Sequence, residues 1–218
     1  MQILILIFLA IGLPLGLVFF YDIAWQWIIL GAAAWAVALV IKVVLGWAVN
    51  AFSQKLFTNE KIKSAIWGAW SAICELGIAA IIFIKTSSTL ANVIGFGVGV
   101  GIIEIIYVVS QLIVKKPPKS ESQKGFMKWS LAIERLLTLI GHVSSRGLIW
   151  IGIKSWFLSP FLLIALLLFS IVDGVATYGT ASEWNWSDSR LYKRFLGFVA
   201  VMGAIELILF LVGILLIK

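Results

Sequence analysis

Nine ionisable side chains interrupt the long apolar stretches of this sequence, and they are its candidates for chemistry. They comprise three cations, five carboxylates and one histidine: Lys42, Arg135, Arg146, Glu75, Glu104, Glu134, Asp173, Glu206 and His142. A carboxylate or an imidazole can act as a general base, or pass a proton, when it is held beside a water molecule. In hydrocarbon, each isolated charge costs about 2.5–3.5 kcal/mol, so these groups need partners, water or a function.

The three polar residues Arg135, His142 and Arg146 are spaced by seven and four residues, which places them on one face of a helix. We expect this face to look into a helix bundle, with His142 within about 8 Å of Glu75, Glu104 or Asp173, because lipid exposure would be costly. The alternative to a functional site is a purely structural role, in which these residues form internal ion pairs that fix helix packing. Glu206 could pair with Lys42, Arg135 or Arg146, or could contact a partner.

Four glycines alternate with larger residues just before Glu104, in the stretch GFGVGVG: Gly95, Gly97, Gly99 and Gly101. A phosphate-binding loop is excluded because neither a preceding strand nor an adjacent basic residue is present. The pairs Gly95/Gly99 and Gly97/Gly101 have the small-xxx-small spacing that permits close helix contact. The pattern therefore predicts helix packing, which could also position Glu104 against another helix.

Metal and cofactor chemistry is poorly supported by the residue types. The only histidine, His142, would leave carboxylates alone to complete a metal site. The single cysteine, Cys74, lies in an apolar run and cannot form an internal disulfide. We expect neither a metal nor a cofactor.

The elements that must position these residues are long apolar helices. The chain has 218 residues, of which 62% are hydrophobic and 12% charged, with a mean hydropathy of +1.09. A soluble domain carries roughly 25% charged residues, and this chain has too few polar side chains to cover the surface of a soluble globule. The sequence predicts an all-α, single-domain, multi-pass membrane protein with seven spans of about 20 residues. The predicted spans are 2–20, 25–49, 64–84, 89–114, 129–152, 157–178 and 194–217.

The net charge of +7 reflects an uneven distribution of basic residues between the two sides of the predicted bundle. If the N-terminus is cytoplasmic, eleven cations lie on that side: Lys55, Lys61, Lys63, Lys115, Lys116, Lys119, Lys124, Lys128, Arg190, Lys193 and Arg194. Three lie on the other: Lys85, Lys154 and Lys218. The positive-inside rule then predicts a cytoplasmic N-terminus and an outside C-terminus in the plasma membrane. The charge indicates contact with membrane lipids, with the segment 115–128 near anionic head groups, and does not indicate nucleic acid.

Four short polar motifs follow one another along the chain. They are Cys74-Glu75-Leu76-Gly77-Ile78, then Gly99-Val100-Gly101-Ile102-Ile103-Glu104, then Glu134-Arg135 with His142 seven residues later, and finally Phe169-Ser170-Ile171-Val172-Asp173. In order and spacing, over about residues 65–178, they resemble the YhfC family of predicted intramembrane proteases. That family is related to CAAX proteases and bacteriocin-processing enzymes that use glutamate.

The resemblance implies a site in which a glutamate activates water and neighbouring groups stabilise the oxyanion. On that basis Glu75 or Glu104 would be the base, and His142 or Arg135 the donors. Glu134, Arg146 and Asp173 would support the polar cavity.

The sequence departs from the family pattern: its first motif keeps only one of two glutamates, and one arginine and two histidines are also lost. The family has an arginine where this chain has Ile78, and histidines where it has Val100 and Phe169. These losses indicate impaired hydrolysis.

Three functions remain open at this point. The first is a catalytically degenerate scaffold or receptor that binds a transmembrane segment or a membrane-protein partner. The second is an active intramembrane peptidase with Glu75 as general base and His142 assisting. The third is a proton-coupled transporter that uses Glu75, Glu104, His142 and Glu206.

Overall fold

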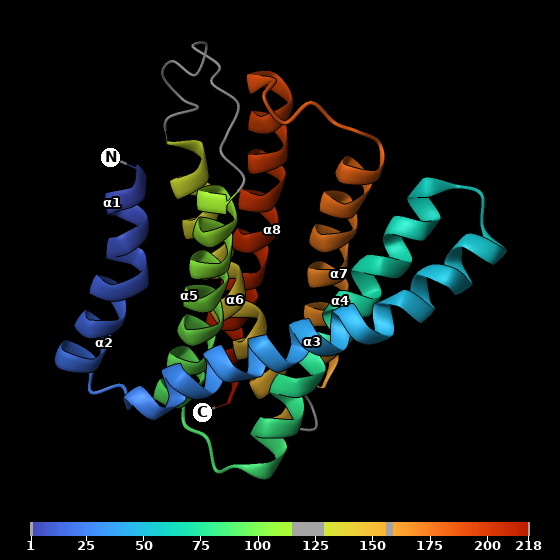
Figure 1. Ribbon diagram of the computed structural model, residues 1–218. Coiled ribbons are helices and arrows are strands. Elements are labelled where there is room, and N and C mark those ends of the chain that lie inside the picture. The colour runs from blue at the N-terminus through green and yellow to red at the C-terminus, as the bar shows by residue number, and fades with distance from the viewer. Residues whose placement is uncertain (1, 115–128, 156–158, 218) are drawn as a thin grey trace.

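A computed structural model describes residues 2–114, 129–155 and 159–217, and every regular element in these ranges is helical (Figure 1). The elements are α1 (Gln2–Ile7), the π-helical turn η1 (Phe8–Gly12), α2 (Leu13–Tyr21), α3 (Trp25–Leu56), α4 (Glu60–Lys85), α5 (Leu90–Val114), α6 (Ser130–Lys154), α7 (Pro160–Ala181) and α8 (Ser189–Leu216). The predicted all-helical class is confirmed for these residues. The basic segment 115–128, for which lipid contact is predicted, lies outside them.

Seven helices of the described residues are long and apolar enough to cross a membrane, as the sequence predicts. They are Leu4–Tyr21, Trp25–Leu56, Glu60–Lys85, Leu90–Gln111, Ser130–Lys154, Pro160–Ala181 and Ser189–Leu216. They range from 18 to 32 residues, against the roughly 20 that span hydrocarbon.

The helices α3 and α4 extend beyond the apolar stretches from which they were predicted. α3 continues to Leu56 and α4 begins at Glu60, because polar side chains near the turn satisfy one another. The side chain of Asn59 caps α4 by accepting a hydrogen bond from the backbone N–H of Lys61. Lys63 Nζ donates to Gln54 at 2.6 Å and to Glu60 at 2.8 Å. The hairpin is thus helical nearly to its tip.

The two prolines in the helices lie where the backbone tolerates them. Pro14 would clash with the carbonyl of Ala10 in a regular α-helix. The chain instead forms the π-helical turn η1 just before it, with the N–H of Leu13 donating to the carbonyl oxygen of Phe8. Pro160 is in the first turn of α7, where no intrahelical N–H is required.

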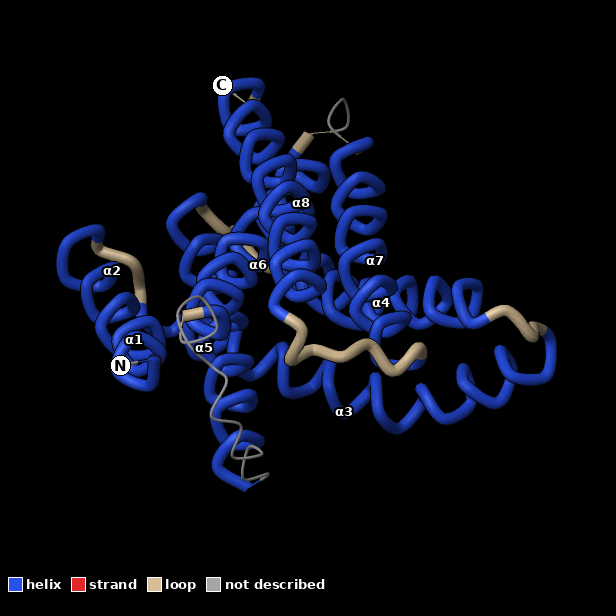
Figure 2. Tube along the Cα trace, turned by 90° about the horizontal axis from the view of Figure 1, so that it is seen from above, coloured by secondary structure: helices blue, strands red, loops and turns tan. Residues whose placement is uncertain are grey.

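α6 is the central helix of the bundle. It packs against α4, α5, α7 and α8, and against α1 near the N-terminus. Figures 1 and 2 show α5, α6 and α8 side by side, whereas α3 crosses them obliquely and forms with α4 a hairpin that projects to one side. The N-terminus and the α7–α8 connection lie at one end, and the α4–α5 connection and the C-terminus at the other.

The main apolar core collects buried side chains from α3 to α8, including Trp35, Phe83, Phe96, Ile149 and Phe210. The rings of Phe83 and Phe96 meet edge to face at 5.1 Å. A smaller core, of Leu6, Leu9 and Ile105, attaches the N-terminal helix to α5. The polar site lies among the same helices as the main core.

The glycines of α5 face two neighbouring helices. A Cβ at Gly99 would meet the backbone carbonyl of Ile28 on α3, and one at Gly95 would meet the side chain of Ile23 at 2.7 Å. On the other face, a Cβ at Gly97 would lie 2.6 Å from the Cα of Val143 on α6. The two small-xxx-small pairs therefore let α5 lie close to α3 and α6 at once.

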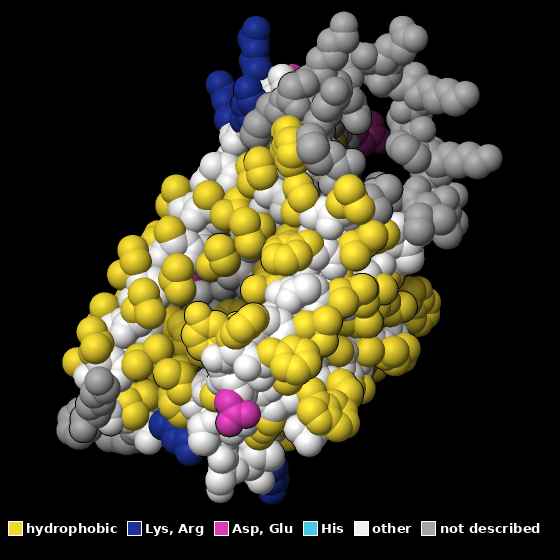
Figure 3. Space-filling model, turned by 90° about the vertical axis from the view of Figure 1, so that its left-hand side faces the viewer, with side chains coloured by type: hydrophobic (Ala, Val, Ile, Leu, Met, Phe, Trp, Pro, Cys, Tyr) yellow, Lys and Arg dark blue, Asp and Glu magenta, His cyan; other side chains and the backbone are white. Residues whose placement is uncertain are grey.

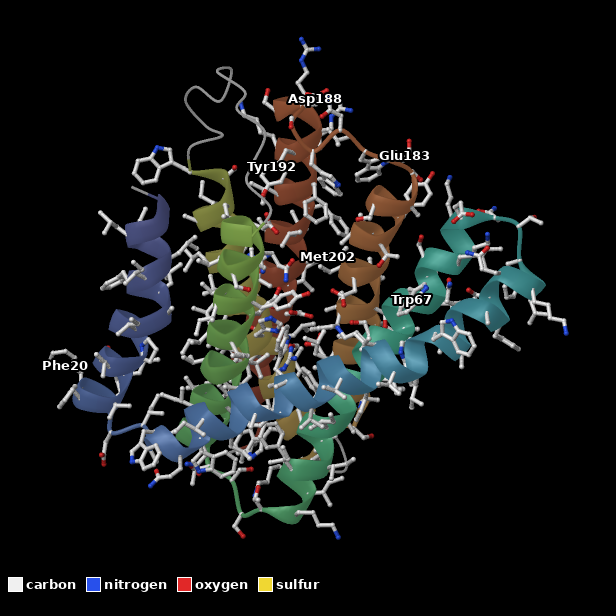
Figure 4. The ribbon with its side chains drawn as sticks, in the orientation of Figure 1. Phe20, Trp67, Glu183, Asp188, Tyr192 and Met202 are labelled. Atoms are coloured by element: carbon white, nitrogen blue, oxygen red, sulfur yellow. The ribbon has the colours of Figure 1, made fainter. Side chains whose placement is uncertain are left out.

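The outer surface of the bundle is strongly apolar. Phe20, which points away from the bundle in Figure 4, is 84% exposed, and Trp47 is 81% exposed. Figure 3 shows one face covered with hydrophobic side chains, with Lys and Arg side chains gathered near its ends. Contiguous apolar surface of this extent is unusual for a soluble monomer.

Replacing Gly99 by alanine should lower the thermal unfolding midpoint of the protein purified in detergent. The new methyl group would push against the backbone of α3, and overpacking of this kind costs about 1–3 kcal/mol. Gly77→Ala is the matched control, because no atom lies within 4 Å of a Cβ at that position. Its midpoint should not fall. Equal losses in the two variants would contradict the proposed role of Gly99.

Candidate functional site

Polar side chains from six helices form one continuous chain of hydrogen bonds and ion pairs inside the bundle. In order along the network they are Asp173, Ser71, Lys42, Glu75, Arg146, His142, Glu104, Arg135, Glu134 and Tyr192. They come from α3, α4, α5, α6, α7 and α8. Residues up to 150 positions apart in sequence are thereby joined in a single cluster.

Glu75 is held between two cations. Lys42 Nζ contacts its Oε1 at 2.6 Å, and Arg146 Nη2 contacts its Oε2 at 2.7 Å. The side chain of Glu75 is 5% exposed and that of Arg146 is 1% exposed. Because both side chains are almost completely buried in the protein, each charge depends largely on the other for its stabilisation.

Glu104 is held in the same way by α6. Arg135 Nη1 contacts its Oε1 at 2.6 Å, and His142 Nε2 is hydrogen-bonded to its Oε2. Arg146 Nη1 lies 2.8 Å from His142 Nδ1. Since an arginine can only donate, Nδ1 must accept, and the proton of a neutral His142 is on Nε2 and points to Glu104.

The network ends at Asp173 on one side and at Tyr192 on the other. The hydroxyl of Ser71 donates to Asp173 and accepts a hydrogen bond from Lys42 Nζ at 2.8 Å. At the other end, Arg135 Nη2 contacts Glu134 at 2.5 Å, and the Tyr192 hydroxyl donates to the same carboxylate. Figure 4 shows Tyr192 near the start of α8, close to the connection that carries Glu183 and Asp188.

Helical periodicity explains why these side chains point inward. Arg135, Leu139, His142, Arg146 and Ile149 are all buried on α6, at alternating spacings of four and three residues. α4 presents Ser71 and Glu75 in the same manner, one turn apart. Each polar residue thus replaces an apolar one in a buried stripe.

A cavity of about 240 Å³ adjoins the network. Its lining includes the carboxylates of Glu75, Glu104, Glu134, Asp173 and Glu206. The rings of Trp35, Phe169 and Phe195 also line it. The space would hold about eight water molecules at roughly 30 Å³ each, so it is more than the site of a single water.

Glu206 is in the cavity but outside the network. It is 4% exposed and forms no hydrogen bond or ion pair with any residue in the described ranges. Of the ion-pair partners considered from sequence, Lys42, Arg135 and Arg146 bind other carboxylates instead. The Nε–H groups of the two arginines are also buried without a partner in those ranges.

The arrangement limits the chemistry that the site can perform. Each oxygen of Glu75 and Glu104 already accepts a hydrogen bond from Lys42, Arg146, Arg135 or His142, which makes it a weaker base toward a water, and the Nη groups of Arg135 that would stabilise an oxyanion are bonded to carboxylates. No group of three His, Cys, Asp or Glu side chains suited to a metal occurs within the described ranges. The site is organised more for binding than for bond cleavage.

The residues predicted to form the site all line or adjoin the cavity. Glu75, Glu104, Glu134, Arg135, His142 and Asp173 line it, and Arg146 joins it through Glu75 and His142. Sequence reasoning missed Ser71 and Tyr192. Ser71 lies one turn before Glu75, and Tyr192 begins the buried stripe of α8 that includes Glu206, so helical spacing from the known acids could have found both.

The chain matches no protein-family model, no curated protein and no solved structure. Its function therefore has to be inferred from the geometry of the site.

Removing the guanidinium of Arg146 should destabilise the protein strongly. Arg146→Met removes the guanidinium from Glu75 Oε2 and from His142 Nδ1, and breaking a buried pair costs about 3–5 kcal/mol. Adding Glu75→Gln should recover part of the loss, because the oxygen that has lost its guanidinium then belongs to a neutral amide. Thermal unfolding of the single and double variants measures the coupling, with Arg194→Met on the exposed surface as control. Strictly additive losses would contradict the pairing.

Proposed function

We propose that this chain is an integral membrane protein that resembles glutamic intramembrane proteases but serves as a membrane-embedded receptor or scaffold. Its polar cavity binds a transmembrane segment of a partner and does not hydrolyse it. The seven long apolar helices and their exposed apolar surface support insertion in a membrane. The assignment to the plasma membrane rests on the distribution of basic residues along the sequence.

The orientation follows from the same distribution. The N-terminus and the α7–α8 connection, which are at one end of the bundle, face the cytoplasm. The α4–α5 connection and the C-terminus face the outside. Arg190 and Arg194, at the start of α8, are exposed near the end that we assign to the cytoplasm.

The engagement of both central glutamates by cations is the observation that carries the receptor proposal. Glu75 lies between Lys42 and Arg146, and Glu104 lies between Arg135 and His142. A hydrolytic glutamate must be basic enough to take a proton from a water. Here each oxygen of both carboxylates already accepts a hydrogen bond from the bundle, and the neighbouring cations make the carboxylates weaker bases.

The positions at which the family histidines are missing support the same conclusion. Val100 is 2% exposed and packs in the apolar core. Phe169 lines the cavity, where its ring contacts the guanidinium of Arg146 at 5.1 Å. Neither side chain can accept or donate a proton in a hydrolytic step.

Proton transport is less well supported by this geometry. The network is continuous, but Arg146 separates Glu75 from His142, and Arg135 separates Glu104 from Glu134. An arginine keeps its protons in proteins and cannot accept another, so it interrupts a proton relay.

The orientation is tested with single cysteines in a Cys74→Ala background. Ser87, between α4 and α5, and Ser187, between α7 and α8, are both exposed and provide isosteric Ser→Cys changes. A membrane-impermeant maleimide should label Ser87→Cys in intact cells, and Ser187→Cys only after permeabilisation. The reverse pattern would overturn the orientation, and equal labelling of both sites in intact cells would overturn the seven-span topology.

Binding without cleavage is tested by adding a panel of single-span peptides to the purified protein. We expect at least one peptide to bind and to be recovered intact, as mass spectrometry would show. Gly203→Trp, which fills the cavity, should weaken binding at least tenfold. Gly197→Trp is the control, because it is on the exposed side of the same helix with no atom within 4 Å of its Cβ.

The peptidase alternative has a distinct outcome in the same assay. Cleavage of any peptide by the wild-type protein, abolished in both Glu75→Gln and His142→Ala, would overturn the receptor proposal.

A further inference from the structure

Glu206 is a buried carboxylate that the network leaves unpartnered. It is 96% buried by residue surface, lines the cavity and forms no hydrogen bond with any other described residue. One of its oxygens would lie 3.6 Å from a Cβ built at Gly141, so the carboxyl group lies close to α6 at a position without a side chain. Leaving such a group unpaired is costly, which indicates that something complements it.

The charge balance around the cavity points to a cation. Five carboxylates line the cavity, whereas only three permanently charged cations, Lys42, Arg135 and Arg146, belong to the network. His142 does not add a fourth, because its Nδ1 accepts from Arg146. The cavity therefore has two carboxyl groups more than the network has cations, and a bound positive group would favour their ionised form.

The lining of the cavity favours an organic cation over a metal ion. The carboxylates are spread over five helices, and no group of three metal-ligating side chains occurs within residues 2–114, 129–155 and 159–217. The rings of Trp35, Phe169 and Phe195 line the same space. Aromatic faces attract ammonium and guanidinium groups when these are desolvated.

We infer that the cavity binds a protonated amine or guanidinium, supplied by a basic side chain of the partner's transmembrane segment, through the carboxylate of Glu206. The assignment of the source rests on the receptor function proposed above. The cation itself does not, since it follows from Glu206 and the aromatic lining. A lone basic residue in a transmembrane helix needs an acidic partner, and this cavity provides one that no residue of the described chain uses.

The test compares two single-span Leu–Ala peptides that differ only at the centre, one with lysine and one with methionine. Each is labelled and titrated against the full-length protein in lipid nanodiscs. The lysine peptide should bind at least tenfold more tightly to the wild type. Glu206→Gln should remove this difference, whereas Glu183→Gln, the same change at an exposed residue of the α7–α8 connection, should preserve it.

Each other outcome has a defined meaning. Equal binding of both peptides to the wild type would overturn the cation inference and leave the receptor proposal standing. Binding of neither peptide would overturn both. Cleavage of the lysine peptide, together with a preference that Glu206→Gln removes, would overturn the receptor proposal alone.

A competition arm identifies the source of the cation. Free n-butylammonium, at the concentration of the lysine peptide, should not displace it, because only the peptide also packs its apolar helix against the bundle. Displacement would assign the site to a free amine and overturn the transmembrane source. The thermal midpoint of Glu206→Gln should not fall below that of the wild type, since the change breaks no ion pair and removes an unpaired buried carboxyl group.

Discussion

The structure depends on one buried guanidinium. Arg146 is almost completely enclosed, and it bonds to Glu75 on α4 and to His142 on its own helix, while the ring of Phe169 on α7 covers it. In a medium without water, an arginine must have all of its charge compensated by protein groups. The positions of α4, α6 and α7 relative to one another are thereby constrained, since a shift of any one would leave a charge exposed to apolar surroundings.

The same constraint extends outward in two directions from Arg146. Glu75 also bonds to Lys42, which constrains the position of α3, and His142 bonds to Glu104, which constrains the position of α5. Close approach of α5 is possible only because its glycines offer no side chain toward α3 and α6. Small residues and charged residues therefore act together: the glycines bring the backbones near, and the ion pairs select one register among those that close packing would allow.

The contrast between paired and unpaired acids separates the structural part of the cluster from the part open to a ligand. Glu75 binds two cations and Glu104 binds Arg135 and the imidazole of His142, and both resemble the interior of a folded core more than a catalytic site. Glu206 shares their burial and borders the same cavity without a partner. In the receptor function proposed above, the glutamates are structural while the cavity that they line stays open to a ligand, because burial strengthens the hydrogen bonds within an ion pair.

The helical class, the seven apolar helices and the inward face of α6 could all be predicted from the sequence, because the length of an apolar stretch and the 3.6-residue period are local properties. The cost of a polar side chain in hydrocarbon also predicted that His142 lies near a carboxylate. Which acid His142 and Arg146 each contact depends on how distant helices pack, since Glu104 is 38 residues from His142 and Glu75 is 71 residues from Arg146. Ser71 and Tyr192 are uncharged, so only their helical spacing from the acids pointed to them, and their hydrogen-bond partners on other helices could not be predicted. The isolation of Glu206 was likewise a tertiary outcome, because every cation near it had been taken by another carboxylate.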